Sequence, residues 1–166
     1  KTTLLGLLTG CCAPTEGHIL FNGVPSVQVE NLNSLVTVMA QQPMLFEDSL
    51  HNNLSMYQKL SDKEMISALK MVNLTSFADT AGLDSLIKEG GKNLSGGERR
   101  RICLARSLLR KTPVLILDEP LAEVDPDSVR MIEDLIISLR GVTLFVISHQ
   151  VSPRFEAAFD LHIQVG

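Results

Sequence analysis

Two adjacent carboxylates, Asp118 and Glu119, directly follow the apolar run 114–117. A buried strand that delivers two carboxylates to one end is costly unless they meet a cation or take part in a proton transfer. One of them could hold Mg²⁺ while the other orients or deprotonates a water molecule. Taken alone, the pair is explained equally well by helix capping or by solvent exposure just past the strand.

A glycine pair follows a serine in the segment 94–98, Leu-Ser-Gly-Gly-Glu. At the start of a helix, Ser95, Gly96 and Gly97 would offer unobstructed N–H groups and a hydroxyl at the positive end of the helix dipole. An ordinary N-cap needs only Ser95, and a second glycine weakens a helix start. The pattern therefore favours the close approach of an anion such as a phosphate.

Three further features carry weaker signals. Lys1 and Thr2 open a helix as the end of a phosphate loop would, with the lysine neutralising phosphates and the hydroxyl binding Mg²⁺, although Lys-Thr pairs are common by chance. His149 follows an apolar run, where a structural histidine is the more frequent explanation. Asp125 and Pro126 suit an N-cap and the first position of a helix.

Strands and helices alternate along the chain and would bring these residues together. We expect strands at 18–21, ending in an Asn-Gly turn, at 35–39, leading to Gln41, and at 114–117 and 142–147, the last two buried. This alternation predicts an α/β doubly wound sheet, in which ligands bind beyond the carboxyl ends of the strands.

The expected helices are recognised by apolar residues at helical spacing. The first begins at residues 1–3 and buries four leucines, and the second, with a capping box at 61–64, lies in a helical insertion spanning about 49–86. The third follows Ser95 and has the arginines at 99–101 mostly on its outside, and the fourth covers 126–139. The capping box at 61–64 and the helix-start residues Asp125 and Pro126 agree with this apolar spacing.

Composition bounds the broad class of the protein. The chain has 166 residues, of which 45% are hydrophobic and 20% are charged, with a formal net charge of −4, which fits one compact globular domain and calls for no nucleic acid. Its three cysteines match neither a disulfide framework nor a zinc site, and we expect a reducing cytoplasm. No apolar stretch approaches the roughly 18–20 residues that cross a bilayer.

The motifs together resemble, in order and spacing, the ABC ATPase family. The resemblance rests on Lys1-Thr2-Thr3, Gln41, the segment 94–98, the segment 115–120, Asp125 and Ser148-His149. It implies a P-loop NTPase core of the ABC type, with a mainly parallel sheet and a helical subdomain of about 43–110 inserted after the Q-loop. Residues 1–166 would be a single partial ATP-binding domain, since the N-terminal strand and the glycines of the phosphate loop are not in the sequence.

The same resemblance implies a role for each matching residue. It implies that the domain binds ATP and Mg²⁺, with Lys1, Thr2 and Thr3 as the end of the Walker A motif and Gln41 as the Q-loop residue that reaches Mg²⁺ and the attacking water. Asp118 would be the metal partner, Glu119 the general base and His149 the switch histidine. Asp125 would be the D-loop aspartate, and Ser95, Gly96 and Gly97 would form the signature. Thr2, Gln41 and Asp118 would be the metal-binding residues. The signature would contact ATP held by a second cassette, so the implied unit is a head-to-tail dimer, homomeric or heteromeric.

Segments 43–46, 52–54 and 88–93 resemble the corresponding segments of exporter-type cassettes. This implies a transmembrane domain upstream on the same polypeptide and a position at the cytoplasmic face of a membrane. It also implies that nucleic acid is not a partner. The alternatives are a soluble ABC ATPase acting on nucleic acid or ribosomes, and an inactive or regulatory transporter cassette. Two departures from the family pattern stand out: Glu98 replaces the usual glutamine, and Glu123 places an acid in the D-loop, where Ser-Ala-Leu-Asp is usual. We expect this fragment alone, without the strand before Lys1, to be poorly folded.

Overall fold

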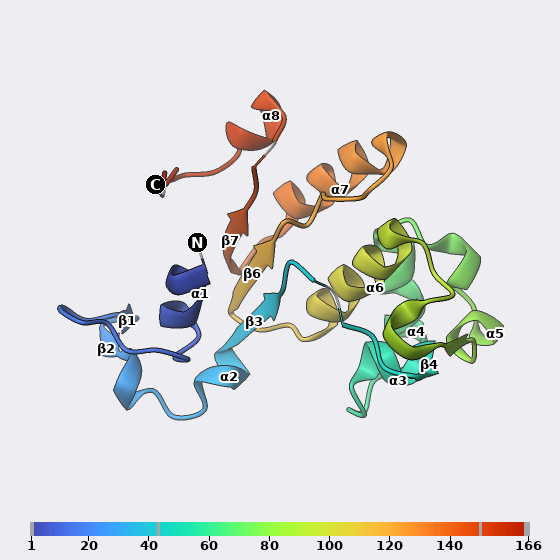
Figure 1. Cartoon of the computed structure of the whole chain (residues 1–166), viewed down its shortest axis with the longest axis horizontal. Coiled ribbons are helices and arrows are strands. Elements are labelled where there is room, and N and C mark those ends of the chain that lie inside the picture. The colour runs from blue at the N-terminus through green and yellow to red at the C-terminus, as the bar shows by residue number, and fades with distance from the viewer. Residues whose placement is uncertain (1, 43, 150, 165–166) are drawn as a thin grey trace.

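Three parallel strands form the centre of the structure, a computed structural model that describes residues 2–42, 44–149 and 151–164 (Figure 1). In spatial order they are β3 (Val36–Met39), β6 (Val114–Asp118) and β7 (Thr143–Ile147). Val36 pairs with Val114, and Val114 pairs with Thr143. The carboxyl ends of all three strands therefore lie along one edge. The predicted α/β fold with a mainly parallel sheet is confirmed, and Asp118 ends the middle strand.

The middle and outer strands differ in how well they are covered. Leu115, Ile116 and Leu117 of β6 are buried, as a continuously apolar central strand should be. Among the described residues β7 pairs with β6 alone, and its last four residues are only half-buried. The predicted strand at 142–147 is therefore confirmed, whereas its full burial is not.

The N-terminal part consists of short elements beside the sheet. They are α1 (Thr2–Leu8), β1 (Leu20–Phe21), β2 (Val24–Pro25), a 3-10 turn (Ser26–Gln28) and α2 (Leu32–Leu35). Asn22 and Gly23 join β1 to β2 with φ of 50° and 84°, the left-handed geometry that a tight Asn-Gly hairpin requires.

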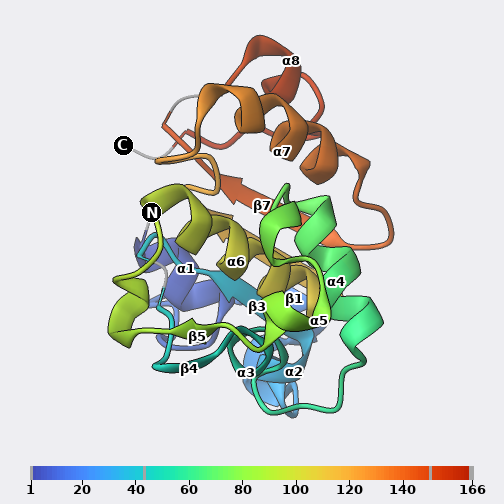
Figure 2. The ribbon, with the colours of Figure 1, turned by 90° about the vertical axis from the view of Figure 1, so that its right-hand side faces the viewer.

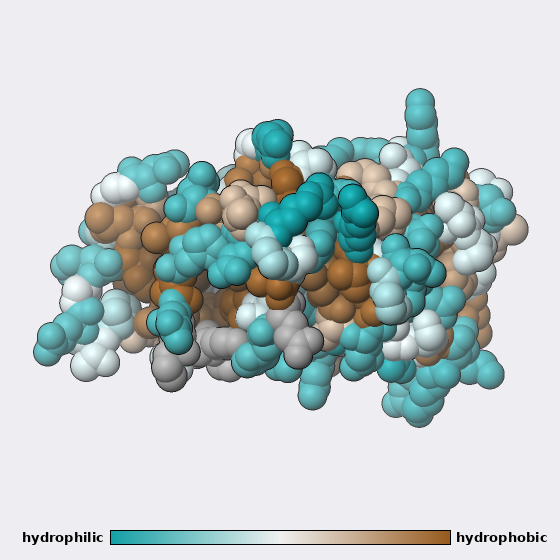
Figure 3. Space-filling view, turned by 90° about the horizontal axis from the view of Figure 1, so that it is seen from above, coloured by the Kyte–Doolittle hydropathy of each residue, from teal (hydrophilic) through white to brown (hydrophobic). Residues whose placement is uncertain are grey.

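An apolar groove separates α1 from β7. Leu4, Leu5 and Leu8 of α1 line this groove of about 560 Å³ together with β7 and Phe155. The leucines of α1 are half-buried, not buried as predicted, because the groove leaves them partly open. Seen from above, the molecule shows hydrophobic surface between polar side chains (Figure 3).

A helical lobe follows β3 in the chain. Its elements are β4 (Asp48–Ser49), α3 (Leu50–Ser55), α4 (Asp62–Met71), a 3-10 turn (Thr75–Phe77), α5 (Thr80–Leu83), β5 (Leu86–Ile87), a 3-10 turn (Glu89–Gly91) and α6 (Gly96–Leu109). The capping box predicted for α4 is present: Ser61 Oγ accepts from Glu64 N–H at 3.3 Å, and the Glu64 carboxylate accepts from Ser61 N–H at 3.2 Å. Met65 and Leu69 of α4 are fully buried.

Helix α6 joins the lobe to the sheet. It contacts β3 as well as α3 and α4, and lies across the strands in the side view (Figure 2). Arg100, Cys103, Leu104 and Ser107 are all buried, at the spacing i, i+3, i+4, i+7 of one helix face. The prediction that the arginines at 99–101 mostly lie outside is therefore wrong for Arg100, which is only 4% exposed.

The C-terminal part contains α7 (Pro126–Ser138) and α8 (Pro153–Glu156). Asp125 is the N-cap of α7, where its carboxylate accepts from Ser128 N–H at 2.9 Å, and Pro126 opens the helix, both as predicted. The buried side of α7 holds Ile132, Ile136 and one carboxylate, Glu133. In the residues that the structure describes, no helix has the length and apolar character needed to span a membrane.

Candidate functional site

Glu119 leaves the end of β6 in a conformation that few side-chain-bearing residues adopt. Its φ is 51°, in the left-handed region, at a cost of roughly 1–3 kcal/mol for residues other than glycine. Its N–H donates to the carbonyl of Ile147 at 2.8 Å, and its carbonyl accepts from Ala122 N–H at 3.2 Å. The chain therefore turns sharply at Glu119, directly after Asp118, the half-buried last residue of the strand.

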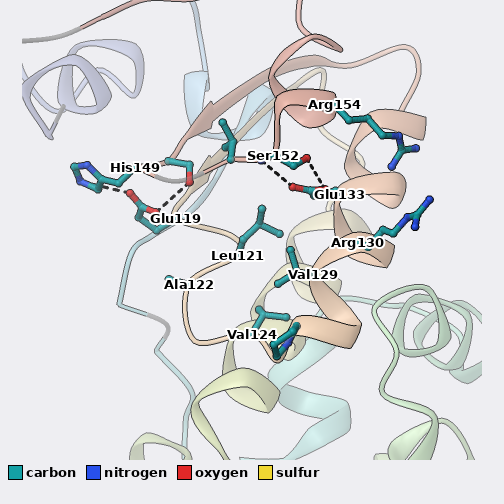
Figure 4. A pocket seen from close by; sticks show the side chains of 13 residues that line it. Glu119, Leu121, Ala122, Val124, Val129, Arg130, Glu133, His149, Ser152 and Arg154 are labelled. Atoms are coloured by element: carbon teal, nitrogen blue, oxygen red, sulfur yellow. Dashed lines mark hydrogen bonds and ion pairs between the residues drawn. The ribbon is translucent and has the colours of Figure 1, made fainter.

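The Glu119 carboxylate meets the residues that follow β7 (Figure 4). Ser148 Oγ donates to Glu119 Oε2 at 3.4 Å, and His149 Nε2 lies 3.6 Å from Glu119 Oε1. The glutamate side chain is 12% exposed and the histidine side chain 72%. A separation of 3.6 Å suits an ion pair but exceeds a hydrogen bond, and among the described residues the buried Oε1 has no hydrogen-bond donor. A buried carboxylate oxygen of this kind is suited to a water molecule or a cation.

The acids at this edge suit one kind of metal site. Among the described residues, no group of three or more His, Cys, Asp or Glu side chains could enclose a metal ion. Mg²⁺ needs no such cage, because proteins commonly hold it through one or two carboxylates together with substrate phosphates and water. The Asp118 carboxylate and Glu119 Oε1, which accepts no hydrogen bond from the described residues, fit that donor set.

An open cleft of about 730 Å³ runs from this carboxylate along α7 (Figure 4). Glu119 and His149 line one side of it, and Ser152 lies farther along it, beside Glu133 (Figure 4). There the Ser152 hydroxyl donates to the buried Glu133 carboxylate at 2.9 Å and also caps α8 by accepting from Phe155 N–H at 3.1 Å. The segment that carries His149 is thus held by β7 before it and by Glu133 after it.

The remaining predicted residues near the sheet lie in different surroundings. Gln41 is exposed, just beyond Met39, which pairs with Leu117, so it lies at the same edge as Asp118. Thr3 is exposed within α1. Lys1 and the side chain of Thr2 lie outside the described residues, although Thr2 is the first residue of α1.

The signature segment starts α6. Ser95 Oγ accepts from Glu98 N–H at 3.1 Å, and the Glu98 carboxylate accepts from Ser95 N–H at 2.8 Å, which together form a capping box. The acid at position 98 is therefore accommodated as part of the helix start, where it also suits the dipole.

The two signature glycines lie against the loop 122–125 of the same chain. A Cβ on Gly96 would overlap the Glu123 carboxylate, and a Cβ on Gly97 would lie 3.0 Å from the Glu123 carbonyl oxygen. The backbone contact at Gly97 gives that glycine a reason without a ligand, whereas the flexible Glu123 side chain could move away from a Cβ on Gly96. The phosphate-binding role of both glycines stays a prediction. Among the described residues that line the 730 Å³ cleft, none belongs to the signature.

Asp125 ties the loop 122–125 to α6. Its Oδ2 accepts from Arg101 Nη1 at 2.7 Å while its Oδ1 caps α7. Hydrogen bonds from Ser128, and then from Arg101, lower the pKa of the Asp125 carboxyl. The aspartate therefore has a structural role in this chain.

Three residues at the site were not predicted from the sequence: Arg100, Glu133 and Ser152. Arg100 Nη1 donates to the Glu119 carbonyl at 2.6 Å. The available signal was helical spacing, since Arg100 and Glu133 both fall on the buried faces of their helices. Ser152 precedes Pro153 and so matches the cap pattern of a helix start, but nothing in the sequence names its partner.

Comparisons with known proteins agree with this geometry. The sequence profile of the family described as "ABC transporter" matches residues 1–122. The chain is 36% identical over 159 residues to the ATP-dependent lipid A-core flippase of Francisella tularensis subsp. holarctica (strain OSU18), covering 92% of this chain and 26% of the flippase. It is also 36% identical over 163 residues to P-glycoprotein 14 of Caenorhabditis elegans, covering 95% of this chain and 12% of that protein.

A solved structure described as a bacterial Atm1-family ABC exporter with ATP bound superimposes on the chain with a TM-score of 0.83 at 28% identity. The superposition covers 90% of this chain and 27% of the exporter. The chain therefore spans about a quarter of the length of the flippase and of this exporter.

Proposed function

The chain belongs to the ABC transporter family, and from that premise we propose that it is part of the ATP-hydrolysing domain of an exporter. Hydrolysis of ATP at this domain would drive transport across a membrane. The names of the similar proteins support an exporter over a soluble ATPase that acts on nucleic acid or ribosomes, as does the negative net charge.

The observation that carries the proposal is the buried Glu119 carboxylate, held at the sheet edge next to Asp118 and His149, with one oxygen, Oε1, that accepts no hydrogen bond from the described residues. In this role Glu119 accepts the proton of the attacking water, and His149 contacts the terminal phosphate. Asp118, Gln41 and Thr2 would hold Mg²⁺, which when bound neutralises charge that develops on the phosphates. Lys1 and Thr3 would contact the phosphates from the start of α1.

The domain organisation follows from the same family membership. Residues 1–166 would be a single partial ATP-binding domain, in which about 43–110 form the helical subdomain that contains α3 to α6. A second cassette would place ATP against Ser95, Gly96 and Gly97, and Asp125 would lie at the seam between the two. Attachment to a transmembrane domain upstream on the same polypeptide would hold this domain at the cytoplasmic face of a membrane, with no nucleic acid involved.

The proposal is tested by steady-state ATP hydrolysis in the full-length protein. Glu119→Gln keeps the size of the side chain but removes the base, and we expect kcat to fall by about two orders of magnitude or more. Glu16→Gln, at an exposed glutamate that has no assigned role in the site, makes the same charge change and serves as the control. Equal hydrolysis rates for the two variants would remove Glu119 from the role of base.

A further inference from the structure

Arg100 is a buried cation whose closest acceptor is the backbone of the candidate base. Its guanidinium lies at the interface of α6 and the loop after β6, only 4% exposed, and Nη1 donates to the Glu119 carbonyl at 2.6 Å. Among the described residues, Arg100 Nε has no hydrogen-bond acceptor. Burial of a guanidinium is costly unless it is paired, so a buried arginine with so few partners calls for a role beyond packing.

The bond from Arg100 completes the constraint on Glu119. Ala122 N–H and Arg100 together occupy both lone pairs of the Glu119 carbonyl, while the Glu119 N–H is bonded to the Ile147 carbonyl. A left-handed residue other than glycine persists where its surroundings fix it in this way. If the guanidinium were removed, the carbonyl would keep one donor, and the peptide after Glu119 could rotate toward a less strained conformation.

The counter-charge of Arg100 comes from the loop 122–125. Arg100 Nη2 lies 3.9 Å from Glu123 Oε1, and the Glu123 side chain is 63% exposed and packs over Gly96. Glu123 itself has a left-handed backbone, with φ of 59°. Arg100 therefore lies between the backbone of the candidate base and the acid that departs from the family pattern in this loop.

We propose that Arg100, with Glu123 as its counter-charge, is a positioning residue that holds the left-handed backbone of Glu119 and so keeps the Glu119 carboxylate directed toward Ser148 and His149. The inference rests on the proposed role of Glu119 in ATP hydrolysis. Arg100 acts through the Glu119 carbonyl, with no contact of its own to the substrate required. Its loss should therefore slow turnover more than it weakens nucleotide binding.

The test compares kcat and KM for Mg-ATP in the full-length protein carrying Arg100→Met, Arg100→Lys or Arg99→Met. Arg100→Met keeps the length of the side chain without its donors, and a small displacement of a base lowers kcat by about tenfold to a hundredfold, with KM within about threefold of the parent. Arg100→Lys restores a cationic donor and should recover kcat to within about fivefold. Arg99→Met removes a charge from the same helix turn and should leave both constants unchanged. A kcat for Arg100→Met equal to that of Arg99→Met overturns the inference, as does a lysine variant no better than the methionine variant.

A loss of folding in Arg100→Met, detected by circular dichroism, would leave Glu123→Gln as the decisive variant, because it removes the counter-charge at an exposed position. A fall in kcat of about threefold or more at unchanged KM is then expected, and an unchanged kcat refutes the inference. Glu119→Gln, assayed alongside, separates the two claims. Its full activity would refute the proposed function and the role of Arg100 with it, whereas its inactivity beside a normal kcat in the Arg100 variants refutes the inference alone.

Discussion

Replacing Ser152 by alanine tests how the segment after His149 is anchored. The Ser152 hydroxyl makes two bonds: it caps α8 through Phe155 N–H at 3.1 Å, and it donates to the buried carboxylate of Glu133 at 2.9 Å. Loss of an N-cap costs about 1 kcal/mol, and loss of a hydrogen bond to a buried charged group costs about 1.5–3 kcal/mol. Ser152→Ala should therefore lower the free energy of local opening by about 2.5–4 kcal/mol.

The assay is amide hydrogen exchange of the α8 segment in the full-length protein, with Ser152→Thr as the control because threonine keeps the hydroxyl. Since 1.4 kcal/mol is a factor of ten, exchange in α8 should accelerate by roughly 50-fold to 1,000-fold in Ser152→Ala and by less than about threefold in Ser152→Thr. Equal protection in the two variants would show that the bond to Glu133 does not hold this segment.

Three further predictions concern stability and reactivity. The Lys111 ammonium, 2.7 Å from the Glu64 carboxylate, together with Ser61, lowers the pKa of Glu64 to about 2. The contribution of the pair to stability is therefore present above the ordinary pKa of 4.5 and lost as the pH falls through about 2. Lys111→Met should raise the pKa of Glu64 in an NMR titration, and an unmoved pKa would contradict the pairing. Gly82→Ala should markedly lower the thermal midpoint because its Cβ would overlap the Phe77 backbone, a clash that no side-chain movement relieves, and a midpoint equal to that of the parent would show that this turn can shift. Burial raises the pKa of the Cys103 thiol, so iodoacetamide should label the adjacent pair of exposed cysteines well before Cys103, and equal labelling rates would contradict the burial.

The sequence predicts the sheet and its functional edge well because both follow from local patterns. The strands at 36–39 and 114–118 and the caps at Ser61 and Asp125 depend on residues a few positions apart, where propensity and periodicity are informative. Glu119 and His149 fall together since the carboxyl ends of neighbouring parallel strands must share an edge.

The misplaced residues depend on contacts between elements far apart in the sequence. Arg100 looks like one of three surface arginines until the loop after β6 is found against α6, where Glu119 and Glu123 cover its guanidinium. The sequence of β7 is as apolar as that of the central β6, although β7 is only half-buried, because hydrophobicity alone does not say how many described strands lie beside it. The signature glycines illustrate the same limit, since Glu123, which lies against them, comes from a loop after the next strand.

The most direct test of the central claim is the chemical state of nucleotide bound to Glu119→Gln in the full-length protein under single-turnover conditions with Mg-ATP. If Glu119 is the base, the nucleotide recovered from this variant will be ATP, retained long after the parent has converted its bound nucleotide to ADP and phosphate. Formation of ADP by Glu119→Gln at the rate of the parent would contradict the account, because the buried carboxylate opposite His149 would then have no part in the proton transfer.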